Sequence, residues 1–306
     1  MIASNAQDLS AAVLAEMNRA ENPRLRQILS AAVQHLHAFA TEVQLSEAEF
    51  QQACAQIARL GHLTTPSHNE VVLCAGSLGL SALVCLLNNR GPGDEPTSAN
   101  LLGPFWIVRS ATQGEPIFVT AFVHDVHGEP VPGAEVDVWH SSAEGYCENQ
   151  DPQQADMNLR GRFITDAQGC IRFRSIKPVG YPVPVNGVVG DLLRALGRHN
   201  LRPAHLHFLI HKPGFKTQFS QVYSSDDPNL DTDVQFGVTP ALIANYVRHE
   251  SGPAPDADVQ GAWYSLEHRF VIHPGEARRP RAPISAKAGG ERPPRVRLAR
   301  RPDARS

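Results

Sequence analysis

The sequence predicts a mainly β protein, an antiparallel β-sandwich preceded by an all-α amino-terminal region. The first ninety residues carry apolar side chains at spacings of three and four, which is typical of amphipathic helices. After a stretch rich in Gly, Pro and Asn at 88–97, short alternating segments and polar turns replace that pattern. We therefore expect a helical region at 1–95, a sandwich domain at 96–274 and a basic tail at 275–306.

Four helices are expected in the amino-terminal region. Two cover 9–17 and 25–43, the second opening with Pro23, a residue that the first helical turn tolerates. Capping boxes beginning at Ser46 and Ser67 predict the starts of the next two, and Gly61 is expected to close the third. The fourth, at about 69–87, is apolar on most sides, so we expect it to pack against a dimer partner or the second domain.

The second part is expected to consist mainly of short strands, with one helix among them at 191–196. The strands are expected at 117–124, 134–139, 161–165, 171–176, 205–211 and 217–223. Strands that follow one another through polar turns, instead of alternating with helices, favour an antiparallel sandwich over a parallel sheet.

Composition limits the class of protein. Hydrophobic residues make up 42% of the 306 residues and charged residues 19%, as in globular proteins. There is no run of 18 apolar residues and no secretion signal at the start, so we expect a cytoplasmic protein without a membrane segment. Five cysteines without a C-x-x-C pair indicate free thiols and argue against a cysteine metal site.

Charge is distributed unevenly along the chain. Residues 275–306 hold ten Lys or Arg and three acids, which leaves 18 basic and 28 acidic residues in the remainder. Such a tail is expected to be solvated and disordered. It has no interleaved aromatic residues, so no nucleic-acid role is expected.

The segment from Arg202 to Phe208 carries the strongest chemical signal. His205 and His207 are two residues apart on a predicted strand, so both imidazoles point to one face and can converge on one metal ion. His35 and His37 have the same spacing on a predicted helix, where a two-residue step turns the side chains apart. The spacing therefore indicates a metal site only at the strand pair.

Two tyrosines lie in predicted loops. Tyr146 follows Gly145, and Tyr181 stands among Gly180, Pro182 and Pro184, residues that stiffen a loop. Phenol oxygens held in this way can be metal donors, or they can donate structural hydrogen bonds within turns. Both interpretations are open at this point.

Six ordered motifs resemble the intradiol ring-cleaving dioxygenases, non-haem ferric enzymes that open catechols between their hydroxyls. The motifs are Leu-Gly-Pro-Phe at 102–105, Val-Trp-His at 138–140 with Gly145-Tyr146, Asn-Leu-Arg-Gly at 158–161, Gly-Tyr-Pro-Val-Pro at 180–184, Gly-Arg-His at 197–199 and Arg-Pro-Ala-His-Leu-His at 202–207. The resemblance runs from about Pro23 to Pro274.

The resemblance implies one Fe(III) per chain, with O2 as co-substrate. Its ligands would be Tyr146, Tyr181, His205 and His207. Arg202 and Gln218 would line the site as catalytic residues, and Tyr181 would yield its place on the metal to the substrate. Two anionic phenolates with two neutral imidazoles suit Fe(III).

The resemblance also implies a small aromatic diol as substrate. Hydroxyquinol is the first expectation, giving 3-hydroxy-cis,cis-muconate or maleylacetate, and catechol or chlorocatechol is the alternative. Gly76 stands where hydroxyquinol enzymes usually carry Asp, which predicts a less polar pocket. The resemblance implies that the substrate pocket is lined by Leu73, Gly76, Pro104, Phe105, Val183 and Pro184.

Other classes remain open beside this one. The chain could be a β-sandwich aromatic-binding module without catalysis. A zinc hydrolase based on His205 and His207 would lack a nearby acid, since Asp226 and Asp227 belong to a later turn. The resemblance further implies a homodimer packed through the amino-terminal helices, which sometimes enclose a lipid-like molecule.

Overall fold

The computed structural model describes residues 5–89, 99 and 114–279. The chain divides into two compact units, Met1–Ala58 and Arg59–Ser306. This division differs from the boundary expected at residue 95, because the helices after residue 59 belong to the same unit as the sheets. The tail beyond residue 279 lies outside the described residues.

The first unit contains α1 (Ala6–Met17), α2 (Pro23–Glu42) and the start of α3 (Glu47–Leu63). The side chain of Asn22 caps α2 by accepting hydrogen bonds from the amides of Arg24 and Leu25. At α3 the expected capping box is present, since the amide of Ser46 donates to Glu49 (2.9 Å) and the amide of Glu49 donates to Ser46 Oγ (3.3 Å). Gly61 lies inside α3 and does not close it.

The expected fourth helix is two helices, α4 (Glu70–Ser77) and α5 (Leu80–Asn88), bent by 77°. Gly79 between them has φ +74°, a left-handed conformation that glycine adopts without a steric penalty. Asn69 caps α4, so the capping box expected at Ser67 does not form. Among the described residues, no single helix is long and apolar enough to cross a membrane, and α4 with α5 passes that test only as a bent pair.

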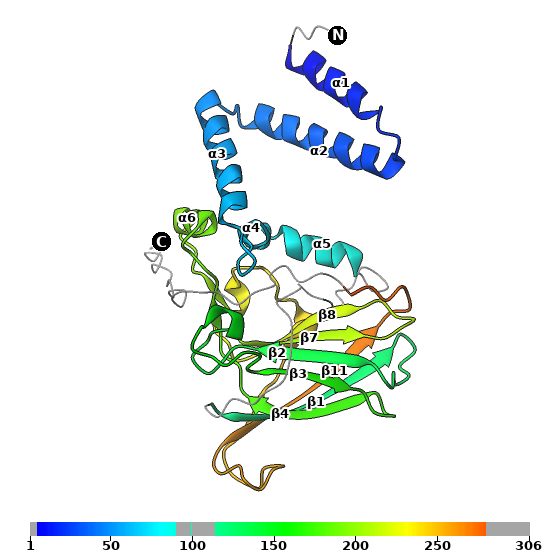
Figure 1. Ribbon diagram of the computed structural model, residues 1–306, viewed down its shortest axis with the longest axis vertical. Coiled ribbons are helices and arrows are strands. Elements are labelled where there is room, and N and C mark those ends of the chain that lie inside the picture. Colours follow the sequence, from blue (N-terminus) through cyan, green and yellow to red (C-terminus); the bar gives the residue numbers. More distant parts are fainter. Residues whose placement is uncertain (1–4, 90–98, 100–113, 280–306) are drawn as a thin grey trace, which may run out of the picture. The chain divides into compact units, whose positions relative to one another are not determined.

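The second unit contains eleven strands among the described residues and the helix α6 (Val188–Ala195) (Figure 1). The strands are β1 (Pro116–Asp125), β2 (Glu135–His140), β3 (Arg160–Ile164), β4 (Cys170–Ile176), β5 (Tyr181–Pro182), β6 (Leu201–Arg202), β7 (His205–His211), β8 (Gln218–Ser224), β9 (Ile243–Ala244), β10 (Val247–His249) and β11 (Trp263–Ile272).

Two main sheets form the sandwich, with strand orders β10-β11-β1-β4 and β3-β2-β7-β8-β9. Strands β5 and β6 form a separate short pair. The mainly β fold is confirmed, but its sheets are mixed, since β1 pairs with β11 and β8 with β9 in parallel. The long strand β11 was not expected from the sequence.

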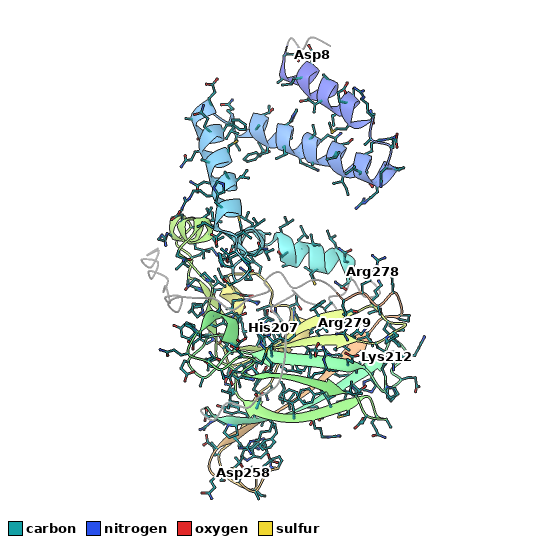
Figure 2. The ribbon with its side chains drawn as sticks, viewed as in Figure 1. Asp8, His207, Lys212, Asp258, Arg278 and Arg279 are labelled. Carbon is teal, nitrogen blue, oxygen red and sulfur yellow. The ribbon has the colours of Figure 1, made fainter. Side chains whose placement is uncertain are left out.

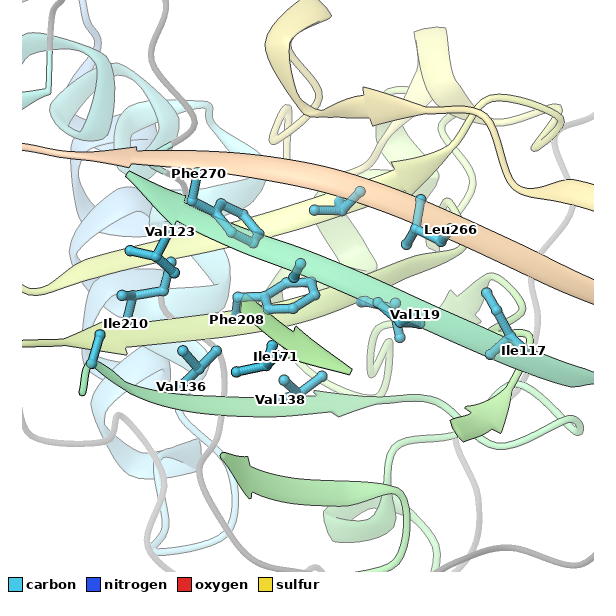
Figure 3. Close-up of a cluster of buried hydrophobic side chains, with 14 of the residues drawn as sticks. Ile117, Val119, Val123, Val136, Val138, Ile171, Phe208, Ile210, Leu266 and Phe270 are labelled. Atoms are coloured by element: carbon cyan, nitrogen blue, oxygen red, sulfur yellow. The ribbon is translucent and has the colours of Figure 1, made fainter. Parts of the chain in front are cut away.

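Alternation along the strands builds the core between the sheets (Figure 3). Ile117 and Val119 of β1 meet side chains from β2, β7 and β11 in one buried apolar cluster. From β7 this cluster takes Leu206, Phe208 and Ile210. Because neighbouring side chains point to opposite faces, His205 and His207 lie on the other face of that sheet.

Candidate metal centre

Three buried side chains converge on the outer face of β7. The Nε2 atoms of His205 and His207 are 3.0 Å apart, and the Tyr181 hydroxyl lies 3.5 Å from His205 Nε2. Two donors that each bind a metal at about 2.1 Å and subtend a right angle are about 3.0 Å apart. The spacing of these donors therefore fits a shared metal ion.

The surrounding structure fixes the two imidazoles. His205 Nδ1 lies 2.6 Å from the carbonyl oxygen of Pro203, so Nδ1–H donates and the lone pair of Nε2 faces the cluster. The His207 ring stacks on Trp139, its register partner on β2, with centroids 4.9 Å apart and planes 6° apart. His207 of β7 is labelled in Figure 2.

Burial keeps all three donors neutral in the absence of a cation. It lowers the pKa of His205 to about 3, with a further contribution from the Arg202 charge, and it lowers the pKa of His207 well below its ordinary value. Burial also raises the pKa of Tyr181, against the charge of Arg202. Neutral imidazoles are ready to coordinate, whereas the phenol needs a cation to ionise at neutral pH.

Arg202 lies beside this cluster and is held on several sides. Arg202 of β6 is the register partner of Tyr181 of β5, and its charge lowers the pKa of the Tyr181 phenol against the effect of burial. Its Nη2 donates to Gln221 Oε1 (2.9 Å) and to the Tyr223 hydroxyl (2.6 Å). Asp233 accepts from both Nε and Nη2.

The expectation that Gln218 lines the site is corrected by the register of β8. Gln218 pairs with Ile210, a core residue, so it points to the face opposite the histidines. Gln221 pairs with His207 and points to the same face as it does. The glutamine on the outer face of β8 is therefore Gln221, which the motif interpretation missed by three residues.

Tyr146 and Cys147 occupy different surroundings. The Tyr146 side chain is half-buried, and its carbonyl accepts from the amide of Ser142 and the side chain of Gln154. Cys147 is 4% exposed, and burial raises the pKa of its thiol to about 11. A cysteine in the site was not expected from the sequence.

The structure describes some of the expected pocket residues but not all of them. Leu73 packs against an apolar cluster that contains Val183, Val189 and Leu193. A Cβ at Gly76 would collide with the side chain of Gln235, so α4 approaches this region closely there. Pro184 is half-buried, and the expectations for Pro104 and Phe105 lie outside the described residues.

Two further site residues, Tyr223 and Asp233, were not singled out from the sequence. Tyr223 is the register partner of His205, and their rings are 4.9 Å apart. Tyr223 lies two residues after Gln221 on the same strand, so alternation along the strand could have predicted that Tyr223 belongs to the site. Asp233 follows a 3-10 turn far along the chain, where no local pattern points to Arg202.

Family models match both parts of the chain. Residues 105–267 match a dioxygenase model, and residues 22–95 match a model of the catechol dioxygenase amino terminus. The chain belongs to the intradiol ring-cleavage dioxygenases. It is therefore an oxidoreductase of a non-haem iron family, as its motifs predict.

Named relatives agree with this family. A hydroxyquinol 1,2-dioxygenase from Rhizobium sp. is 35% identical over 85% of this chain and 92% of its own length. A 6-chlorohydroxyquinol 1,2-dioxygenase from Cupriavidus pinatubonensis is 36% identical over 87% of this chain and 97% of its own. The crystal structure of a Pseudomonas putida hydroxyquinol 1,2-dioxygenase has a TM-score of 0.78 and 34% identity, covering 88% of this chain and 99% of that one.

Proposed function

We propose that this dioxygenase cleaves hydroxyquinol between its adjacent hydroxyls, at an Fe(III) ion held by Tyr146, Tyr181, His205 and His207. Both atoms of O2 enter the product, 3-hydroxy-cis,cis-muconate, which is a form of maleylacetate. The observation that carries the proposal is the 3.0 Å separation of the two imidazole Nε2 atoms, with a buried phenol oxygen 3.5 Å from one of them.

The donor set fits ferric iron. A phenolate is a hard anionic ligand, and two neutral imidazoles add donors without adding charge. When bound, Fe(III) supplies the Lewis acidity that makes a chelated catechol reactive towards O2. Tyr146, which is half-buried in the loop after β2, is proposed as the second phenolate ligand.

The protein residues have separate tasks. Tyr181 accepts a proton from a substrate hydroxyl as the diol takes its place in the site. Arg202, the strand partner of Tyr181, stabilises negative charge on the oxygens of the substrate, and this interaction is strong because the guanidinium is almost fully buried. Gln221 and Tyr223 orient the guanidinium through its Nη2 atom.

The wall of the proposed substrate site favours a substituted catechol. Leu73 and Val183 supply apolar surface, and at Gly76 the helix α4 has no side chain in a place where a Cβ would collide with Gln235. The names of the relatives support hydroxyquinol as the first choice. Catechol and chlorocatechol, which would give cis,cis-muconates, are the alternative.

Oxygen uptake by the iron-loaded protein tests the proposal. Hydroxyquinol, catechol, 4-methylcatechol and 3- and 4-chlorocatechol should be compared, and we expect one O2 consumed per diol, fastest with hydroxyquinol. The His207→Ala variant is the control for metal-dependent turnover. Binding of diols by the iron-loaded protein without any oxygen uptake would instead indicate an aromatic-binding module.

We also propose that the chain forms a homodimer through its amino-terminal helices. On α2, large apolar side chains are exposed, among them Leu25, Ile28, Leu36 and Phe39. A dimer mass in analytical ultracentrifugation tests this, and mass spectrometry of an organic extract tests for a bound lipid. A cytoplasmic location is consistent with the five free cysteines.

A further inference from the structure

Gln235 lies between the metal centre and helix α4. It follows the 3-10 turn that precedes Asp233, and its amide donates to Asp233 Oδ1 (3.2 Å), the oxygen that also accepts from Arg202 Nε. Two residues further on, a Cβ at Gly237 would lie 2.7 Å from the Tyr223 hydroxyl and 2.8 Å from Arg202 Nη2. The segment 233–237 therefore packs as closely against this side of the metal centre as a glycine allows.

The side chain of Gln235 reaches from this segment to α4. Its Nε2 donates to Ser77 Oγ (3.3 Å), and Ser77 is 2% exposed. A Cβ placed at Gly76 would overlap Gln235 Oε1 and would lie 2.7 Å from Gln235 Cδ. The carboxamide therefore occupies the space that a side chain at position 76 would fill, and α4 admits it because Gly76 has no Cβ.

Arg198 holds the same two segments together. Its Nη1 donates to the carbonyl of Ser77 (3.0 Å) and its Nη2 to the carbonyl of Val234 (3.3 Å). The guanidinium also lies over the ring of Phe236, 4.3 Å from the ring centroid. Because Arg198 connects α4 to the residues on both sides of Gln235, the surrounding structure fixes where the carboxamide lies.

The carboxamide is a polar group at an apolar wall. Leu73, three residues before Gly76 on the same side of α4, packs against the buried cluster that contains Val183 and Val234. Gln235 is half-buried, and within the described part of the chain its Oε1 accepts no hydrogen bond. Pockets with mostly apolar walls orient their ligands through a few polar groups. The amide oxygen is therefore available to a bound ligand.

We propose that the Gln235 carboxamide recognises the ring substituent of the substrate, in the space where an Asp at position 76 was expected. This inference rests on the proposed function, because it concerns the choice of diol at the same centre. Gln235 Oε1 accepts a hydrogen bond from a third hydroxyl on the ring, as a carboxylate would. Since the amide is neutral, it does so without repelling a diol bound as a dianion.

Selectivity between two diols of similar size tests the inference. Hydroxyquinol and 4-methylcatechol carry a hydroxyl or a methyl group at the same ring position, and only the hydroxyl can donate a hydrogen bond. In the full-length iron-loaded protein, Gln235→Leu should lower the ratio of their kcat/KM values by about tenfold, as loss of one hydrogen bond does. Turnover of catechol, which has no substituent, should stay close to that of the wild type. An equal loss with all three diols would indicate a merely structural role and would overturn the inference.

Gln235→Glu is the matched control for side-chain length and for the acceptor oxygen. Its added charge acts on the ring oxygens of every diol alike, so the preference for hydroxyquinol over 4-methylcatechol should remain as in the wild type. A ratio that falls in Gln235→Glu as far as in Gln235→Leu would contradict recognition by an acceptor oxygen.

Moving the polar group from one segment to the other tests whether both positions share one space. Gln235→Ala removes the carboxamide and leaves room beside Gly76. Gly76→Asp added to Gln235→Ala supplies an acceptor from α4 and should recover most of the lost preference for hydroxyquinol. In the wild-type background the same Asp collides with Gln235, so there it should lower Tm more. Equal effects of Gly76→Asp in both backgrounds, on selectivity and on Tm, would show that the positions are independent and would reject the proposal.

Failure of the inference is distinct from failure of the proposed function. Iron-loaded wild type without oxygen uptake on any diol would reject the proposed function itself. Normal turnover of catechol, with a ratio of hydroxyquinol to 4-methylcatechol that Gln235→Leu leaves unchanged, would reject only the role of Gln235. Circular dichroism of each variant verifies that it is folded.

Discussion

Arg202 and Asp233 form a buried, two-point ion pair beside the metal centre. Nε of Arg202 lies 3.1 Å from Asp233 Oδ1, and Nη2 lies 3.0 Å from Oδ2. Their side chains are 6% and 2% exposed. Although burial by itself raises the pKa of Asp233, the charge and hydrogen bonds of Arg202 lower it below its ordinary value. The pair fixes the plane of the guanidinium that faces Tyr181.

Asp233→Asn should destabilise the fold and impair turnover. Removing one charge of a buried pair leaves the other uncompensated, at a cost of about 3–5 kcal/mol in the free energy of unfolding. Urea denaturation measures this cost, and oxygen uptake measures the loss of turnover. Asp258→Asn is the matched control, since its ion pair with Arg174 is exposed to solvent (70% and 37%) and contributes about 1 kcal/mol or less. Equal stability of the two variants would contradict the prediction.

The two glutamines of β8 give a direct test of the strand register. Gln221→Ala removes a group that orients Arg202 and should lower kcat/KM by about 10–100-fold, as loss of such supporting contacts does at other metal sites. Gln218→Ala, on the opposite face of β8, should leave kcat/KM close to that of the wild type. The reverse order of effects would mean that the register is shifted by one residue.

The buried histidines predict how stability depends on pH. The pKa of His205 is lowered to about 3 and those of His140 and His268 to about 4, in each case mainly by burial. In the unfolded chain these groups titrate near 6.5, so the unfolded state takes up protons first as the pH falls. Their contribution to stability is complete above pH about 6.5 and is lost progressively down to pH 3 to 4.

Urea denaturation of the metal-free protein between pH 7.5 and 4.5 measures this dependence. For each of these histidines, a tenfold difference in proton affinity between the folded and unfolded states corresponds to about 1.4 kcal/mol, so the loss over this range should amount to several kcal/mol. His140→Gln, which removes one of the titrating groups, should reduce the slope. A free energy of unfolding that stays constant between pH 6.5 and 4.5 would disagree with the buried neutral state of these side chains.

The break between α4 and α5 depends on one glycine. Gly79→Ala places a side chain at φ +74° and should destabilise the protein by about 1–2 kcal/mol. Gly61→Ala is the control, because Gly61 lies inside α3 with open space around its Cβ position, and there alanine should stabilise the helix by about 0.5–1 kcal/mol. Thermal unfolding of both variants should give shifts of opposite sign.

Much of the fold, and two of the four expected iron ligands, can be predicted from the spacing of residues within short segments. Alternation predicts β7 and places His205 and His207 on one face, because side chains of a strand point alternately to its two sides. Helical spacing predicts α2 and α3, although not the break at Gly79, since a left-handed glycine leaves no mark on apolar periodicity.

Local periodicity was sufficient to predict the β-sandwich, its helical amino-terminal region and the pair of histidines, because these depend on repeats of two and 3.6 residues within short segments. The packing of the whole chain was needed to establish that Gln221 faces the centre, that Asp233 holds Arg202, and that Cys147 lies against Tyr181. These contacts join residues about twenty to thirty-five positions apart through strand register and loop hydrogen bonds. Pairings at such separations leave no periodic signal in the amino-acid sequence, so they emerge only once the strands and loops are in place.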